Sequence, residues 1–131
     1  MTSDCCRIDD RAIYKITGVA EWRDAEAGGI YRGSADDLRD GFIHFSTATQ
    51  LDVTARKYYT GRPDLLLIAF DPATLGPLLK WEPSRGGALF PHLYTPLETK
   101  LATWVRPLSL DSEGVPRISA ALNGATERKD A

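Results

Sequence analysis

Two histidines are the side chains in this sequence best suited to acid–base chemistry, and both lie in short apolar segments. His44 lies in "GFIHFSTATQ" and His92 in "FPHLY", and the chain has no other histidine. The ordinary pKa of histidine is the closest of any side chain to neutral pH, so histidine readily serves as a general acid or base. Both are therefore candidate catalytic residues.

The position of His44 within its segment suggests which groups accompany it. Side chains alternate across a β-strand, so Phe42, His44 and Ser46 should share one face. Ile43 and Phe45 should take the other face, which we expect to be the core.

The segment around His92 repeats this pattern. If it stays extended, Phe90, His92 and Tyr94 share a face. Each histidine then has an aromatic residue two positions before it and a hydroxyl two positions after it. Such a pattern suits a half-apolar cleft with a few convergent polar groups.

Further polar groups lie close to these two segments. Ser46 and Thr47 precede a predicted helix, whose N-terminal amides and dipole attract anions. The run "KWEPSRGG" contributes Glu82, a third candidate catalytic residue, and Arg85, which can hold a phosphate or carboxylate by a forked contact. Trp81 in the same run offers an aromatic surface for a ligand ring.

Each of these residues also has a purely structural interpretation. A histidine in a strand can be fixed by backbone hydrogen bonds, and the two hydroxyls can cap the helix. Glu82 and Arg85 can form a surface ion pair, and the tryptophans can belong to the core. Convergence of both histidines on one cleft is the observation that would favour function.

Composition limits the classes of protein to consider. The 131 residues are 43% apolar and 26% charged, which is typical of a single globular domain. The net charge of −2 argues against a nucleic-acid binder. No apolar run approaches about 18 residues, so no membrane partner is expected. Oligomeric state has no signature in the sequence.

Known motifs for metals and phosphates are missing from the sequence. Neither G-x-G-x-x-G nor H-E-x-x-H occurs, and the histidines are too far apart to suggest a metal site. Cys5 and Cys6 are adjacent, which does not favour a structural disulfide. They indicate a reduced, cytoplasmic setting, and no role is assigned to them.

Hydrophobic periodicity and turn residues divide the chain into strands and helices. Predicted strands cover residues 12–18, 42–46, 64–71, 78–82, 88–94 and 100–108, and predicted helices cover 20–29 and 47–61, with a single turn within 33–41. This order predicts an α+β fold with a split, mixed or antiparallel β core and short flanking helices. The unbroken apolar run at 64–71 predicts a strand covered on both faces. Pro91 predicts an edge strand or a break.

The same periodicity suggests a domain organisation. We expect a flexible N-terminal arm at residues 1–11 and one globular domain at 12–110. The polar composition of residues 111–131 predicts a largely mobile extension.

Five segments together resemble a family of small bacterial proteins called domain of unknown function 952. They are "IYKI", "GFIHFSTATQ", "DLLLIAFD", "LKWEPSRGG" and "FPHLYTPL", and the resemblance spans about residues 12–108. It implies an ADP-ribosyltransferase-like fold, in which two small sheets form a split β core around a cleft for a nicotinamide dinucleotide. It carries no established activity.

A more distant resemblance is to the RNA 2′-phosphotransferases. "FIHFS" followed by "LLLIAFD" is similar to their "HVHLS" strand and the apolar strand after it. This implies that His44 matches their cleft histidine and Ser46 the serine. Their first strand usually carries a histidine or arginine, and here Tyr14 or Lys15 stands in its place.

These observations support two hypotheses of different classes. The first is an enzyme that cleaves or transfers at the N-glycosidic bond of NAD+ or a related ADP-ribose compound, with NAD as substrate. In this enzyme His44 would hydrogen-bond the ribose or diphosphate, and His92 would act as general acid or base. Glu82 would stabilise an oxocarbenium-like cation. Tyr94 or Trp81 would stack on the nicotinamide ring, and Arg85 would contact a phosphate. The second is a non-catalytic module that binds a nucleotide or anionic metabolite.

Overall fold

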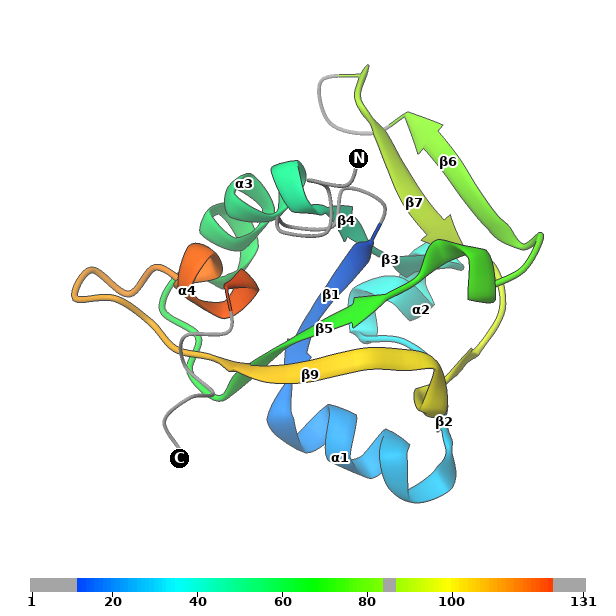
Figure 1. The fold of residues 1–131 in the computed structure, drawn as a ribbon, viewed down its shortest axis with the longest axis horizontal. Coiled ribbons are helices and arrows are strands. Elements are labelled where there is room, and N and C mark those ends of the chain that lie inside the picture. The colour runs from blue at the N-terminus through cyan, green and yellow to red at the C-terminus, as the bar shows by residue number, and fades with distance from the viewer. Residues whose placement is uncertain (1–11, 84–86, 124–131) are drawn as a thin grey trace, which may run out of the picture.

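The computed structural model describes residues 12–83 and 87–123 as a mixed α+β fold with antiparallel sheets (Figure 1). In chain order the elements are β1 (Ile13–Gly18), α1 (Val19–Gly28), β2 (Ile30–Tyr31), α2 (Ala35–Asp40), β3 (Ile43–His44), β4 (Ser46–Thr47), α3 (Ala48–Tyr59), β5 (Leu65–Phe70), β6 (Leu79–Pro83), β7 (Leu89–Leu93), β8 (Leu97–Glu98), β9 (Ala102–Leu108) and α4 (Ile118–Leu122). Short 3-10 turns lie at Pro72–Thr74 and Thr99–Leu101. The predicted α+β class is confirmed.

A four-stranded antiparallel sheet in the order β4-β1-β5-β9 forms the centre of the fold. All six residues of β5 are buried. A strand reads as a continuous apolar run when both faces of its sheet are covered, and this is the case here. The prediction made for residues 64–71 is confirmed.

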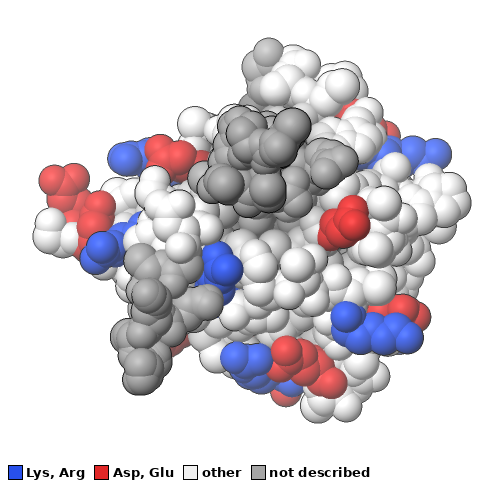
Figure 2. Space-filling view, viewed as in Figure 1, with Lys and Arg blue, Asp and Glu red and all other residues white. Residues whose placement is uncertain are grey.

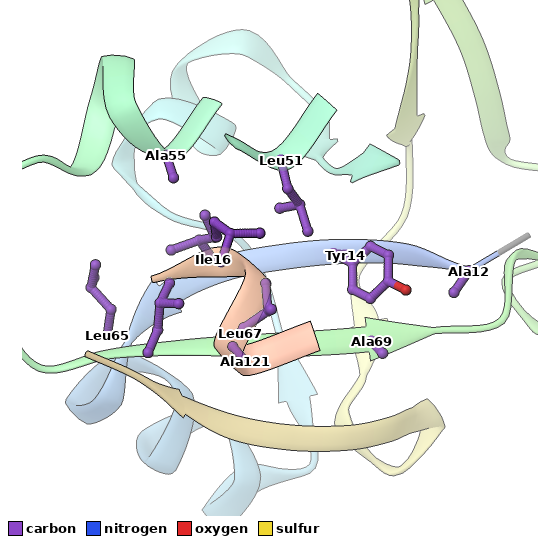
Figure 3. Packing of buried hydrophobic residues seen from close by; sticks show 11 residues of the cluster. Ala12, Tyr14, Ile16, Leu51, Ala55, Leu65, Leu67, Ala69 and Ala121 are labelled. Atoms are coloured by element: carbon purple, nitrogen blue, oxygen red, sulfur yellow. The ribbon is translucent and has the colours of Figure 1, made fainter. Parts of the chain in front are cut away.

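One face of this sheet packs against α3 and α4 (Figure 3). Leu51 and Ala55 of α3 and Ala121 of α4 meet the sheet side chains there, and Tyr14 of β1 lies among them. The helix α4 lies within the polar extension predicted from residue 111 and packs on the core. Ile118 and Ala121 are three residues apart, so both reach the core from one side of the helical turn.

The other face of the sheet packs against α1 and the small sheets. Trp22 of α1 is completely buried, and its ring lies 5.5 Å from the ring of Tyr31 and 6.3 Å from that of Phe70. Ile43 and Phe45 belong to the same cluster. These two side chains occupy the core, as the alternation in "FIHFS" predicted.

The predicted strand at residues 42–46 is divided between two sheets. β3 pairs with β7, whereas β4 pairs with β1, and the chain passes from one sheet to the other at Phe45. The Phe45 N–H donates to the carbonyl oxygen of Pro91 at 3.0 Å, so it remains satisfied where the ladder ends. The expected continuity of this strand is therefore wrong, although its alternation of faces holds for Ile43, His44 and Phe45.

The second sheet has the order β3-β7-β6, and β2 and β8 form a separate two-stranded pair. The strand β7 contains Pro91 and is the central strand of the β3-β7-β6 sheet, so the expectation of an edge strand is wrong. The Pro91 carbonyl faces Phe45, at the point where β3 ends. The proline therefore removes at most one donor at the end of a short ladder, which explains why it is tolerated.

The helix boundaries follow the predicted signals. Gly29 ends α1 with a φ of 85°, and α3 begins at Ala48 directly after Thr47. The Asp37 N–H donates to Ser34 Oγ at 3.2 Å, which caps α2.

Positive and negative side chains are mixed on the face of the molecule that Figure 2 shows. Figure 2 shows Lys and Arg interspersed with Asp and Glu, without a broad field of one sign on this face. Within the described part of the chain, no helix is both long enough and apolar enough to cross a membrane. The predictions for Cys5, Cys6, the arm at 1–11, Arg85 and residues 124–131 concern positions outside the described residues.

Candidate functional site

The two histidines meet across neighbouring strands. The register of β3 and β7 places His44 directly opposite His92, and their ring centroids are 5.4 Å apart. Directly opposed residues of an antiparallel pair point to the same face. Both rings line one pocket of about 300 Å³, a volume at the lower end of those that hold small ligands.

The rest of the pocket is formed by β1, α2, β4, β7, and α3 with the turn after it. Lys15 comes from β1, and Ser46 from β4. Tyr58 and Arg62 lie at the end of α3 and just beyond it. The pocket therefore combines aromatic, hydroxyl, cationic and carboxylate groups with the two imidazoles.

Asp37 is the buried carboxylate that holds His44. Its Oδ1 accepts from the His44 Nδ1–H at 2.6 Å and from the His44 backbone N–H at 3.1 Å. Its Oδ2 accepts from Lys15 Nζ at 2.8 Å and from the Ser34 N–H at 2.9 Å. Four donors therefore satisfy this carboxylate, which ties β1, α2 and β3 together.

Local structure explains how Asp37 reaches this position. It is the third residue of α2, so its side chain turns back to the N-cap Ser34. Gly33 has a φ of 117°, and a Cβ there would lie only 2.6 Å from Asp37 Cβ, so the loop needs glycine to pass so closely. Gly41, with a φ of 89°, ends α2 and returns the chain toward Asp37 as β3.

The environment keeps Asp37 ionised. Burial alone would raise the pKa of its carboxyl. The hydrogen bond from His44, the charge and hydrogen bond of Lys15, and the Ser34 N–H outweigh burial and lower that pKa well below its ordinary value.

His44 also contacts a second carboxylate. Its Nε2 lies 3.1 Å from Asp40 Oδ2. The pKa of Asp40 is lowered chiefly by the hydrogen bond from Arg39. Both ring nitrogens of His44 thus face carboxylate oxygens, and only an imidazolium can donate from both.

His92 is held by a different carboxylate and by stacking. Its Nδ1 lies 2.8 Å from Glu82 Oε1, which also accepts from the Tyr94 hydroxyl at 2.8 Å. The hydrogen bonds from His92 and then Tyr94 lower the pKa of Glu82, and the same bond to Glu82 raises the pKa of Tyr94. Phe42 stacks on the His92 ring with centroids 4.1 Å apart.

The other ring nitrogen of His92, Nε2, differs in its contacts from Nδ1. Within residues 12–83 and 87–123, no group hydrogen-bonds to its Nε2, although the side chain is only 7% exposed. Because Nδ1 donates to Glu82, the neutral ring carries its proton there and leaves the Nε2 lone pair free. This is the arrangement of a general base.

This tautomer can be tested without a ligand. In long-range ¹H–¹⁵N spectra, the neutral form of His92 should show a protonated Nδ1 and an unprotonated Nε2. Glu82→Ala should shift the population toward Nε2–H, since the acceptor that selects the tautomer is lost. Only two histidines contribute signals, and His92→Asn assigns them. Glu98→Ala, at an exposed carboxylate, serves as the control, and an Nε2–H tautomer in wild type would contradict the prediction.

The sequence matches the family described as "Protein of unknown function (DUF952)" over residues 16–105. The chain belongs to the DUF952 family. Asp37, His44, Glu82 and His92 all lie within the matched span.

Solved structures of one similar protein cover most of this DUF952 chain. The crystal structure of protein CC0527 from Caulobacter crescentus is 49% identical, has a TM-score of 0.83, and covers 86% of this chain and 98% of its own. The solution NMR structure of CC0527 is also 49% identical, with a TM-score of 0.77, and covers 85% and 96% of the two chains. Among curated proteins, none matches this chain.

The other predicted site residues of this DUF952 protein divide into two groups. Lys15 and Ser46 line the pocket, and both are at least 95% buried. Ser46 Oγ lies 3.3 Å from Thr54 Oγ1. Tyr94 and Glu82 are not among the pocket-lining residues, and they reach the site through His92.

Three predicted residues lie elsewhere. Tyr14 faces the core with α3, because it alternates with Lys15 along β1. Trp81 is opposite Pro91, which puts it on the sheet face away from His92. Thr47 is the N-cap residue of α3, and its N–H donates to Gln50 Oε1 at 3.0 Å. Thr47 does not line the pocket.

The sequence interpretation missed several residues of the site. Asp37 had one available signal, the Ser-x-x-Asp spacing of a capping box, which indicates that its carboxylate turns toward the chain before α2. No sequence signal pointed to Asp40, to Arg62, or to Phe42 as the stacking partner of His92, because their contacts depend on tertiary structure.

Proposed function

We propose that this pocket binds a small nucleotide-type ligand, such as NAD+ or a related ADP-ribose compound, and carries out acid–base chemistry on it. The observation that supports the proposal is the pairing of His44 with His92, each oriented by a carboxylate, in one pocket. Carboxylate-bound imidazoles are a recurring arrangement for proton transfer. Histidines with a purely structural role would not need two histidine–carboxylate pairs that face one cavity.

The groups around the histidines suit the parts of a nucleotide. The guanidinium of Arg62 lies 5.0 Å from the Tyr59 ring centroid, and within the described residues it forms no ion pair. It is therefore the pocket cation best suited to a phosphate. Tyr58, which is 49% exposed, offers its ring to a base or nicotinamide.

An ADP-ribosyltransferase-like fold with an ADP-ribosyl- or phosphotransferase-like cleft is part of this proposal. Its support is the similarity of "FIHFS" and "LLLIAFD" to the corresponding strands of that fold, together with the position of His44 at the pocket. Arg62 takes the phosphate role first considered for Arg85, and Tyr58 the stacking role considered for Trp81 and Tyr94.

A non-catalytic binding module is the second candidate. The observation that favours it is that both ring nitrogens of His44 are already engaged by Asp37 and Asp40. A ring held on both nitrogens in this way can shape the wall of a binding pocket without transferring a proton.

Thermal-shift and calorimetric titrations test the proposal. We expect NAD+, ADP-ribose or a nucleoside phosphate to stabilise the fold by about 2.7 kcal/mol at 100 times its dissociation constant. Arg62→Ala should weaken binding about tenfold or more, because a charge-assisted hydrogen bond is lost. Arg56→Ala is the matched control, since Arg56 is an exposed arginine of α3 outside the pocket. If no nucleotide binds, or both variants weaken binding equally, the proposal fails.

A further inference from the structure

We propose that His92 and His44 are the general base and general acid of phosphodiester hydrolysis, so that the bond cleaved in this pocket is a phosphorus–oxygen bond. This inference rests on the proposed function for the binding of a nucleotide-type ligand. It goes beyond that function by naming the reaction and the class of substrate.

The first argument is the opposite protonation of the two imidazoles. Asp37 Oδ1 accepts from His44 Nδ1, and Asp40 Oδ2 lies 3.1 Å from His44 Nε2, so a proton on each ring nitrogen would face a carboxylate and His44 is placed to act as a proton donor. His92 Nδ1 donates to Glu82, and among the described residues no group hydrogen-bonds to His92 Nε2, which is therefore placed to accept a proton. An acid and a base thus face one pocket with centroids 5.4 Å apart.

The second argument concerns the carboxylates. Cleavage of an N-glycosidic bond passes through an oxocarbenium-like state, which a nearby carboxylate usually stabilises. Asp37 accepts from four donors, and Asp36 and Asp40 are paired with Arg39. Glu82 does not line the pocket. The lining carboxylates are therefore already paired, which disfavours their use against such a cation.

The third argument concerns the nucleophile. A hydroxyl that attacks a substrate needs a base within hydrogen-bond reach. Among the described residues, Ser46 Oγ lies 3.3 Å from Thr54 Oγ1 and Ser34 Oγ accepts from the Asp37 N–H, and no hydrogen bond joins either serine to an imidazole ring. A single displacement by water, activated by His92, fits this arrangement better than a covalent intermediate.

The fourth argument is the charge of the pocket. Attack on phosphorus spreads negative charge over the phosphoryl oxygens, and fixed cations stabilise it. Lys15, Arg39 and Arg62 line the pocket beside His44, and the lining carboxylates Asp36, Asp37 and Asp40 are themselves paired, which leaves Arg62 as the lining cation without an ion pair among the described residues. Lys15 is held 2.8 Å from Asp37, and so cannot turn away into solvent.

The step balances with water as the only co-reactant. The water oxygen forms a bond to phosphorus while one of its protons passes to His92 Nε2. The phosphorus–oxygen bond to the leaving group breaks with its electron pair, and that oxygen takes the proton of His44 Nε2. The leaving oxygen replaces Asp40 as the partner of Nε2. The protonation states of the rings are exchanged and are restored through solvent.

Leaving groups of different basicity separate the two roles. The substrates are the p-nitrophenyl and the methyl ester of thymidine 5′-monophosphate, and the products are measured by chromatography. His92→Asn should lower the rate on both esters by about 10²–10⁴-fold, because the base is lost. His44→Asn should cause a loss of that size on the methyl ester and less than about tenfold on the nitrophenyl ester, whose weakly basic leaving group needs no proton.

The variants preserve the buried contacts as far as the chain allows. Asparagine can still donate near the Nδ1 position to Asp37 or Glu82, and thermal melts establish that each variant is folded. His44→Gln replaces His44→Asn if the latter does not fold. Glu98→Gln, at an exposed carboxylate outside the pocket, should leave both rates unchanged.

The outcomes distinguish this inference from the function on which it rests. Wild type that binds nucleotides but cleaves neither ester, or releases nicotinamide from NAD+ instead, overturns phosphodiester hydrolysis and leaves the binding proposal intact. Equal losses on both esters in His44→Asn overturn the acid role. Absence of nucleotide binding in the thermal-shift experiment overturns the proposed function itself, and this inference with it.

Discussion

Replacing Asp37 with alanine should lower the free energy of unfolding by about 3–5 kcal/mol, because it leaves a buried charge without its partner. Lys15 is 4% exposed and would keep its ammonium in the interior. The N–H groups of Ser34 and His44 would lose their acceptor as well. Chemical denaturation monitored by tryptophan fluorescence measures the change.

A neighbouring residue provides the control for Asp37. The side chain of Asp36 is 67% exposed and pairs only with an exposed arginine, so Asp36→Ala should change stability by less than about 0.5 kcal/mol. Adding Lys15→Met to Asp37→Ala should recover part of the loss, since the unpaired charge disappears. Equal effects of Asp36→Ala and Asp37→Ala would show that the buried pair has no special role.

The pH dependence of stability identifies the ionised carboxylate as the cause. The folded-state pKa of Asp37 is lowered, so the unfolded chain takes up this proton first as the pH falls. The stabilisation is therefore fully present above the unfolded-state pKa of about 4 and is lost progressively below it. Asp37→Ala should show a shallower loss of stability in this acidic range than wild type does.

Trp22→Ala should lower the free energy of unfolding by a similar amount, about 3–5 kcal/mol, through a different mechanism. The indole is completely buried against Tyr31 and Phe70, and its removal leaves a cavity. The 2.9 Å hydrogen bond that the indole Nε1–H donates to Glu26 is lost as well. Denaturation at neutral pH measures the loss.

Ligand binding separates these two destabilised variants. Trp22 does not line the pocket, so Trp22→Ala should keep wild-type affinity for any nucleotide that binds the folded protein. In Asp37→Ala, His44 loses the carboxylate that orients it. Nucleotide affinity should therefore fall at a temperature where both variants are folded. Unchanged affinity in Asp37→Ala would argue that the orientation of His44 is irrelevant to the ligand.

Local signals accounted for much of the secondary structure. Ser34 and Thr47 mark the starts of α2 and α3, and Gly29 marks the end of α1, because caps and left-handed glycines act within one or two turns. The strand β5 was evident from its unbroken apolar run. The division of "FIHFS" at Phe45 was not, because it depends on two different partner strands.

The candidate site was predictable in part. The alternation of side chains placed His44 on the face opposite Ile43 and Phe45, which depends only on strand geometry. Its pairing with His92 depends on the register of β3 and β7, and a shift of one residue would have put the two rings on opposite faces. The positions of Trp81 and Tyr14 away from the pocket follow from register and alternation in the same way.

The sequence by itself determined the α+β class, the helix ends and the presence of two histidines in apolar segments, because propensity, capping and periodicity act between near neighbours in the chain. Only the tertiary structure decided which carboxylate each histidine meets. Asp37 reaches His44 through the turn at Gly41, and Glu82 reaches His92 across β6 and β7. Hydrogen bonds need their partners within about 3 Å, and between distant segments only strand register and turn geometry bring atoms that close.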